Sequence, residues 1–207
     1  MEDKIVFSDI FRTAWRALKT QFWLLVGLVI GFTIIFSLLL VYAVPAKGES
    51  VSIGGLIVAL ISLLLLCLFM MGYLKNCFQT LDGEEPQFSA YGQVSEKLFS
   101  FLVAFILFVI MVAIGLVLLI VPGIYLALRL QFFYAFMVDE NTGVIESFKK
   151  SWDITKGHAL KLFLGMLLML LISFAGLLTL IVGVFITTPL TALMYAYTFR
   201  KLTTPTA

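Results

Sequence analysis

The chain offers few side chains for acid–base or metal chemistry. It has one histidine, His158, and 12 acidic residues, of which Asp139-Glu140 and Glu84-Glu85 stand in pairs. Hydrolysis of a phosphodiester would need metal-binding carboxylates and a histidine that converge in one pocket. The acidic residues instead follow or precede long apolar runs, and the sequence has no HxE or HxxE pairing and no glycine-rich phosphate loop. We therefore predict no catalytic residues, no metal and no cofactor.

Ser151, Asp153 and His158 could be combined on paper into a hydrolase-like triad. Nearness in sequence does not make an active site, which requires convergent groups and a pocket. An intramembrane enzyme is accordingly the interpretation with the least support, and His158 is better explained as a residue of the membrane interface.

Arg129 is the sharpest candidate for a binding residue. It is the only charge among the 41 residues between Lys97 and Asp139. A charge within a bilayer costs on the order of 3 kcal/mol, so it should have a partner or a watery cavity. Because the apolar runs hold no acidic residue, a charged partner would be a lipid phosphate or an anionic solute. We predict a lipid or anion contact at Arg129, and the alternative is a side chain that extends to the outer headgroups or bonds the carbonyls of 115–121.

The apolar runs around these residues define the class of protein. Soluble domains contain roughly 45–50% apolar and about 25% charged residues, whereas this chain of 207 residues has 62% and 13%, with a mean hydropathy of +1.11. The runs 22–44 and 53–74 carry no charge, and each is long enough as a helix to cross roughly 30 Å of hydrocarbon. The sequence predicts an all-α, polytopic integral membrane protein.

Two further apolar stretches are each about twice the length of a span. They cover 98–138, with Arg129 as their single charge, and 162–199. Since one span needs roughly 20 residues, each stretch should be a helical hairpin, which gives six transmembrane helices in all.

The turns of these hairpins should lie near 115–123 and 176–183. Pro122 has no N–H to donate and Gly123 tolerates positive φ, so the first hairpin should break at this pair. Arg129 would then lie roughly 9 Å below the outer surface, at about 1.5 Å per residue.

The lysines and arginines predict the orientation. Twelve of them fall in the two terminal segments and the two charged segments 75–97 and 149–161, whereas Lys47 is alone in the opposite loop. Positive charge accumulates on the cytoplasmic side, so both termini should be cytoplasmic. Glu2 and Asp3 spoil the basic start of a signal peptide, and we expect none.

Two charged segments contain a tryptophan, FRTAWRALKT at 11–20 and FKKSWDITKGH at 148–158. In helical projection each has an aromatic stripe. The first stripe is Phe7, Phe11, Trp15, Leu18 and Phe22, and the second is Ile145, Phe148, Trp152, Thr155 and Ala159. Such helices suit the headgroup layer. We predict interfacial anchors at Trp15, Trp152, Lys149, Lys150 and Lys156, and Glu146 should pair with Lys150 at (i, i+4).

A weaker third copy of the amphipathic pattern is predicted to begin at Pro86. Its stripe is Phe88, Tyr91, Val94, Leu98 and Leu102. The single transmembrane domain, 1–207, then divides into three pseudo-repeats at about 5–75, 86–138 and 143–201, each a surface helix followed by two spans. A shift of 61 residues places Gly115 on Gly176 and Tyr134 on Tyr195.

The runs PGIYLALR, VDENTG and ESFKKSWDITKG resemble a bacterial family, the membrane domain of glycerophosphoryl diester phosphodiesterase, and related inner-membrane families. The matching positions are Pro122, Gly123, Arg129, Glu140, Ser151, Trp152, Lys156 and Gly157. Such families often carry proline near the end of the fourth span, where this chain has Tyr134-Ala135-Phe136. The resemblance implies a multi-pass module of the bacterial inner membrane, sometimes fused to a catalytic domain but not itself an enzyme, with structural roles for Pro122, Gly123 and Gly157.

The function predicted from these patterns is a non-catalytic membrane module. It would handle lipids, or act as a scaffold or accessory that holds a cytoplasmic or membrane protein partner. The alternative is a small transporter or channel with a path lined by Arg129. Membrane lipids are the expected partners, nucleic acid is not expected, and the oligomeric state is left open.

Overall fold

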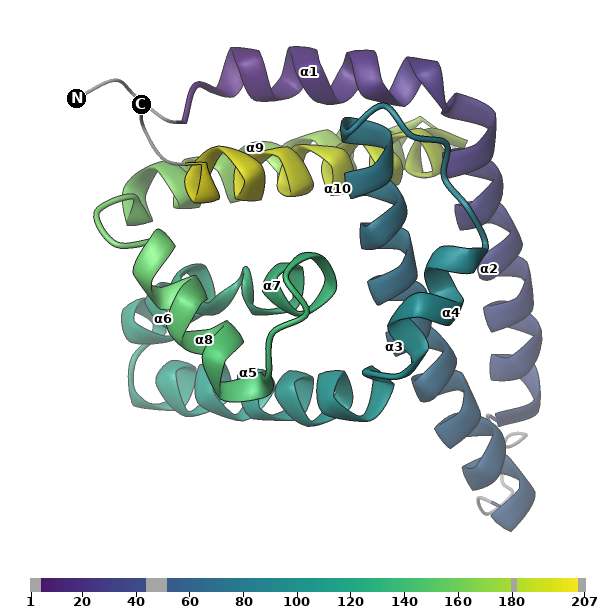
Figure 1. Cartoon of the computed structure of the whole chain (residues 1–207). Coiled ribbons are helices and arrows are strands. Elements are labelled where there is room, and N and C mark those ends of the chain that lie inside the picture. Colours follow the sequence, from purple (N-terminus) through teal and green to yellow (C-terminus); the bar gives the residue numbers. More distant parts are fainter. Residues whose placement is uncertain (1–4, 44–51, 180–181, 205–207) are drawn as a thin grey trace.

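The computed structural model describes residues 5–43, 52–179 and 182–204, and these form α-helices and no strand (Figure 1). The helices are α1 (Phe7–Thr20), α2 (Phe22–Ala43), α3 (Ile53–Leu81), α4 (Ser89–Ser95), α5 (Leu98–Leu118), α6 (Ile120–Leu130), α7 (Phe133–Asp139), α8 (Val144–Ile154), α9 (Ala159–Leu178) and α10 (Val182–Thr203).

Five helical segments among the described residues are long and apolar enough to cross a membrane. They are α2, α3, α5, the segment Ile120–Asp139 that contains α6 and α7, and α9. The chain is therefore an all-helical, polytopic membrane protein. Helix α10, which contains Pro189 and ends in Arg200 and Lys201, is not among the five, and the count of six spans stays a prediction.

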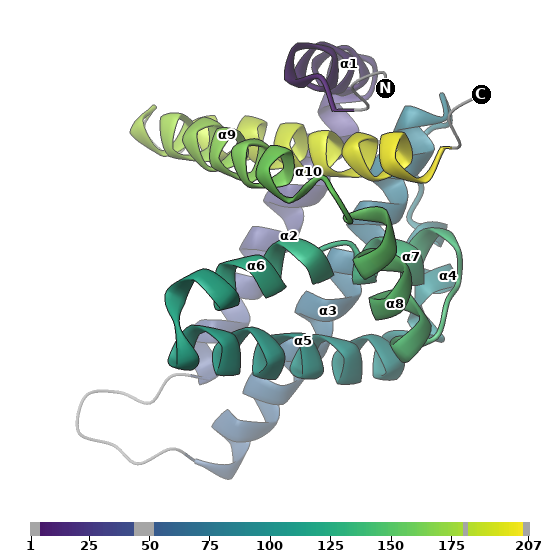
Figure 2. The ribbon, with the colours of Figure 1, turned by 90° about the vertical axis from the view of Figure 1, so that its left-hand side faces the viewer.

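The long helices pair as α2–α3, α5–α6 and α9–α10. The α5–α6 connection and the end of α9 lie on one side of the molecule, and α4, α7 and α8 lie on the other (Figure 2). The α2–α3 pair runs steeply across the other two pairs in both views (Figures 1 and 2). Helix α10 packs against α1, α2, α3 and α9 and so joins the first and last predicted repeats.

The first and last helices are joined directly. The Lys201 Nζ lies 3.1 Å from the Asp9 Oδ2, and the Tyr197 hydroxyl donates to the same oxygen at 3.2 Å. The start of α1 and the end of α10 therefore lie together.

The prediction for Pro122 and Gly123 is wrong in its detail. The chain reverses at Leu119, which is extended (φ −162°, ψ 146°), and Pro122 lies inside the first turn of α6, where its missing N–H would have no partner anyway. Gly123 does not take positive φ. Its lack of a side chain serves close packing instead, because a Cβ added at Gly123 would lie 2.6 Å from the Leu116 N. The predicted turn at 176–183 is reached by the end of α9, and its centre, 180–181, lies outside the described residues.

The predicted fourth span is two helices rather than one. Helix α6 ends at Leu130 and α7 begins at Phe133. The Ser151 hydroxyl of α8 bridges this break, because it donates to the Arg129 carbonyl at 2.8 Å and accepts from the Phe132 N–H at 3.1 Å. A hydroxyl from a neighbouring helix thus satisfies backbone groups that the break would otherwise leave unpaired.

The short helices contact the rest of the fold through residues that mostly lie beside the predicted aromatic stripes. In α1 the buried residues are Ile10, Ala14 and Leu18, whereas Phe11 and Trp15 are about 40% exposed. Side chains such as Ala14 allow close approach to a neighbouring helix, and the broad rings stay exposed at the edge. The prediction that the aromatic stripe contacts the headgroup layer is not tested by this packing.

Helices α4 and α8 also make their contacts through small residues and leave aromatic rings exposed. Ser147, Ser151 and Thr155 are the buried positions at the α8 contact, and Trp152 is 37% exposed. Helix α4 begins at Ser89, not Pro86, and buries Ala90 and Val94. Phe88, Ile145 and Trp15 of the predicted stripes are exposed or partly exposed, so they are free to contact headgroups as predicted, but that contact is untested. Helix α1 packs on α10, α4 on α3, and α8 on α6 and α7.

Candidate functional site

Arg129 is buried between α6 and α8. The residue is 3% exposed, and its guanidinium carbon lies 4.3 Å from the ring centre of Trp152 and 5.8 Å from that of Tyr125. The two rings meet edge to face, with centres 6.0 Å apart. Cation–π contacts of this kind contribute roughly 0.5–2 kcal/mol.

The guanidinium of Arg129 has no acidic partner within the described part of the chain. Its Nε is buried and makes no hydrogen bond. The ion pairs found among the described residues involve Lys150, Arg200 and Lys201. An unpaired buried charge costs several kcal/mol, which exceeds what the two rings return. A guanidinium presents parallel N–H donors that match a phosphate or a carboxylate, so this position is suited to an anion.

The side chain of Arg129 turns toward α8 rather than outward. Arg129 stands nine residues after the start of α6 at Ile120, or about 14 Å along the helix axis, and its ring contacts come from Tyr125 and Trp152. The predicted distance of roughly 9 Å was counted from Pro122-Gly123. The distance from the turn to Arg129 is longer because the turn lies at Leu119. Trp152 is thus a direct neighbour of Arg129, and its role as an interfacial anchor stays a prediction.

The lysines in and after α8 differ in their ion pairing and exposure. The Lys150 Nζ lies 2.8 Å from Glu140 and 3.1 Å from Glu146, which confirms the predicted (i, i+4) pair and raises the pKa of Lys150 through hydrogen bonds to both carboxylates. Lys149 and Lys156 are exposed. Gly157 has φ +81°, which only glycine adopts readily, so its structural role at the end of α8 has a backbone reason.

Trp15 on α1 stacks on Phe11 at 6.3 Å, and Lys19 lies 5.5 Å from its ring centre. This partly exposed aromatic pair is available to headgroups. Its role as an anchor is untested and stays a prediction.

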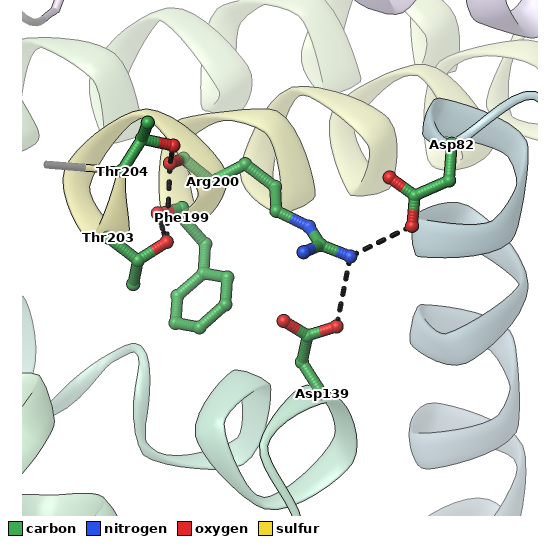
Figure 3. A network of polar contacts seen from close by, with 6 residues as sticks. All are labelled: Asp82, Asp139, Phe199, Arg200, Thr203 and Thr204. Carbon is green, nitrogen blue, oxygen red and sulfur yellow. Dashed lines mark hydrogen bonds and ion pairs between the residues drawn. The ribbon is translucent and has the colours of Figure 1, made fainter.

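A second arginine, Arg200, was counted only as a cytoplasmic charge from sequence. Its Nη2 lies 2.9 Å from Asp82 and 3.1 Å from Asp139 (Figure 3). Its guanidinium also lies 5.1 Å from the ring centre of Phe78. One side chain therefore fastens α10 to the ends of α3 and α7. Partners so distant along the chain leave no local sequence signal.

Two cavities adjoin around Tyr195. A groove of about 480 Å³ lies between α3, α9 and α10, and a smaller cavity of about 170 Å³ lies between α1, α9 and α10. Both are lined by Met166, Met169 and Tyr195, and the smaller one also by Gln131 and Lys161. In the part of the chain that the structure describes, no three His, Cys, Asp or Glu side chains converge to hold a metal ion.

The fold and its five long apolar helices are those of a polytopic α-helical membrane protein. Among the described residues, its buried Arg129 has no acidic partner. The chain belongs to the uncharacterised protein family UPF0259, whose model matches residues 49–205. The expected resemblance to the membrane domain of the phosphodiesterase stays an expectation.

The chain is also similar to uncharacterised proteins of Mycobacterium bovis and Mycobacterium tuberculosis. Each is 32% identical over 159 residues, which cover 76% of this chain and 47% of the relative. The chain thus spans about half the length of these bacterial relatives. No solved structure matches it.

Proposed function

We propose that the chain is a non-catalytic module of the bacterial inner membrane that binds a phospholipid, with Arg129 contacting the anionic headgroup phosphate. The observation that carries the proposal is the buried guanidinium, whose Nε has no acceptor. A lipid phosphate supplies both the missing negative charge and the missing acceptor. Trp152 and Tyr125 are partly exposed rings beside the charge, and rings of this type favour the headgroup level of a membrane.

The proposed module has six spans and cytoplasmic termini. Support comes from the length of α10, 22 residues, from its pairing with α9, and from the ion pair between Asp9 and Lys201 that brings both ends of the described chain together. The excess of lysine and arginine in the predicted cytoplasmic segments supports the same orientation.

Lipid-resolved native mass spectrometry of the detergent-purified protein tests the proposal. We expect the wild type to retain an anionic phospholipid, and Arg129→Gln to retain at least tenfold less. Arg12→Gln is the matched control, because Arg12 is an exposed arginine of α1, and it should retain as much lipid as the wild type.

Size-exclusion chromatography and circular dichroism must show that Arg129→Gln is folded. If that variant folds poorly, Arg129→Lys keeps the charge but removes the paired donors, and it should retain an intermediate amount of lipid. Equal lipid occupancy in the wild type and folded Arg129→Gln would refute the proposal, as would a wild type that carries no lipid.

A further inference from the structure

Three tyrosines from three different helices line one groove. Tyr73, Tyr134 and Tyr195 are spaced 61 residues apart, on α3, α7 and α10, and all three border the 480 Å³ groove. Tyr134 and Tyr195 stack with ring centres 4.9 Å apart and planes 13° from parallel. The shift of 61 residues that relates the second and third predicted repeats therefore also relates Tyr73 of the first predicted repeat to Tyr134.

Residues five positions after these tyrosines also meet. They are Phe78, Asp139 and Arg200. Arg200 forms an ion pair with Asp139 (Figure 3) and lies over the ring of Phe78. The short helices follow one another in the same cyclic order, with α4 on α3, α8 on α7 and α1 on α10. These contacts place the groove where the three predicted repeats join, which is where repeat-built membrane proteins tend to hold their ligands.

The groove presents an apolar surface although several residues that line it are polar. The Tyr195 hydroxyl donates to the Gln131 carbonyl at 2.7 Å, and the Thr191 hydroxyl donates to the Thr187 carbonyl at 2.9 Å. Because these hydroxyls are bonded to backbone, rings and methyl groups face the space. Met70, Met166 and Met169 line it as well, and methionine adapts to irregular apolar ligands.

We propose that this groove binds an acyl chain of a membrane phospholipid. Its volume falls in the range of ligand sites, roughly 300–1,000 Å³. Leu170 lines the groove and is 63% exposed, so the groove is open at the apolar surface of α9. Helix α9 is one of the five helical segments apolar enough to cross a membrane, so acyl chains of a bilayer would surround this opening. The proposal rests on the lipid-binding function but uses residues other than Arg129.

Photo-crosslinking in liposomes tests the acyl-chain site. The probe is a phosphatidylglycerol with a diazirine in one acyl chain, mixed into phosphatidylethanolamine vesicles that hold the purified chain. We expect crosslinks to Met166, Met169 and Leu170. Ala192→Phe fills the groove and should reduce these crosslinks at least fivefold, whereas Ala175→Phe, at an exposed position of α9 outside the groove, should leave them unchanged.

The outcomes separate this site from the one at Arg129. Arg129→Gln should leave the groove crosslinks unchanged even where it loses the headgroup contact. If Ala192→Phe does not fold, Met166→Trp obstructs the partly exposed side of the groove instead. Crosslinks that survive folded groove-filling variants, or that spread evenly over the exposed surface of α9, overturn the proposal. A second polypeptide captured by a benzophenone at Leu170, without lipid adducts, also overturns it in favour of a helix partner.

Discussion

Arg129 and Arg200 differ in the partners of their guanidinium groups, although the Nε of each is buried without a hydrogen bond. Arg200 shares one nitrogen between two carboxylates and is partly exposed, so water and acidic partners both stabilise its ionised form. Arg129 has rings for neighbours and almost no exposed surface. This contrast explains why a ligand is proposed at Arg129 and a structural role is sufficient for Arg200.

At the same scale, Asp9 should make the docking of α1 dependent on pH. The hydrogen bond from Lys201 lowers the pKa of Asp9 from its ordinary value of 3.8. A lowered pKa in the folded state means that the stabilisation is present above about pH 3.8 and is lost as the pH falls through the folded pKa. Asp9→Asn should therefore reduce the melting temperature at pH 6 to 7, and the difference from wild type should shrink as the pH falls below 3.8.

Differential scanning fluorimetry in detergent across this pH range measures the effect. Glu84→Gln, at an exposed carboxylate, is the control and should follow the wild type at every pH. A difference between Asp9→Asn and wild type that stayed constant down to pH 3 would contradict the assigned ion pair.

At the scale of elements, helix pairing depends on glycines at close crossings. A methyl group at Gly115 would lie 2.9 Å from the Cα of Gly123, and backbone cannot yield as a flexible side chain can. By contrast, a Cβ at Gly27 of α2 would meet nothing within 4 Å.

We expect Gly115→Ala to destabilise the α5–α6 hairpin by about 1–3 kcal/mol through overpacking. Gly27→Ala is the matched control and should be neutral, or stabilising by up to about 1 kcal/mol, because alanine is the better helix former. Thermal unfolding in one detergent compares the two variants, and equal melting temperatures would show that the Gly115–Gly123 contact is not tight.

Long apolar elements were predictable because their lengths follow from composition alone, as in 53–74 and 98–138. The face of α1 that packs against the protein was not predicted, because the amphipathic pattern marks the aromatic stripe but does not show that Ile10, Ala14 and Leu18 contact other helices. The break between α6 and α7 was also missed, because it depends on a hydroxyl 19 residues away from Phe132. Arg129 could be singled out by its charge, but its neighbour Trp152 could not.

At the scale of the whole molecule, the hairpin arrangement predicts which ends of the helices share a side of the membrane. Ser52 precedes α3 and Thr179 follows α9, and both are exposed. Glu96 follows α4 and Thr204 follows α10, and these positions are also exposed. Six spans put the first pair outside and the second pair inside.

Labelling of single introduced cysteines with a membrane-impermeant maleimide tests this arrangement. Ser52→Cys and Thr179→Cys should react in intact spheroplasts, whereas Glu96→Cys and Thr204→Cys should react only after lysis. The two native cysteines are buried and give little background. Reaction of Thr179→Cys and Thr204→Cys from the same side would show that α10 does not cross the membrane.

The contacts of α10 with four earlier helices have a consequence for the order of folding during synthesis. The ribosome delivers α1 to α9 before the helix on which α1, α2, α3 and α9 converge. Until α10 is synthesised, the faces of the earlier helices that pack against it stay uncovered in the bilayer. Segments that share a core with a later helix cannot complete their folding before that helix is present. A nascent chain halted before residue 182 should therefore be a substrate for membrane quality-control proteases, however well its individual hairpins have inserted.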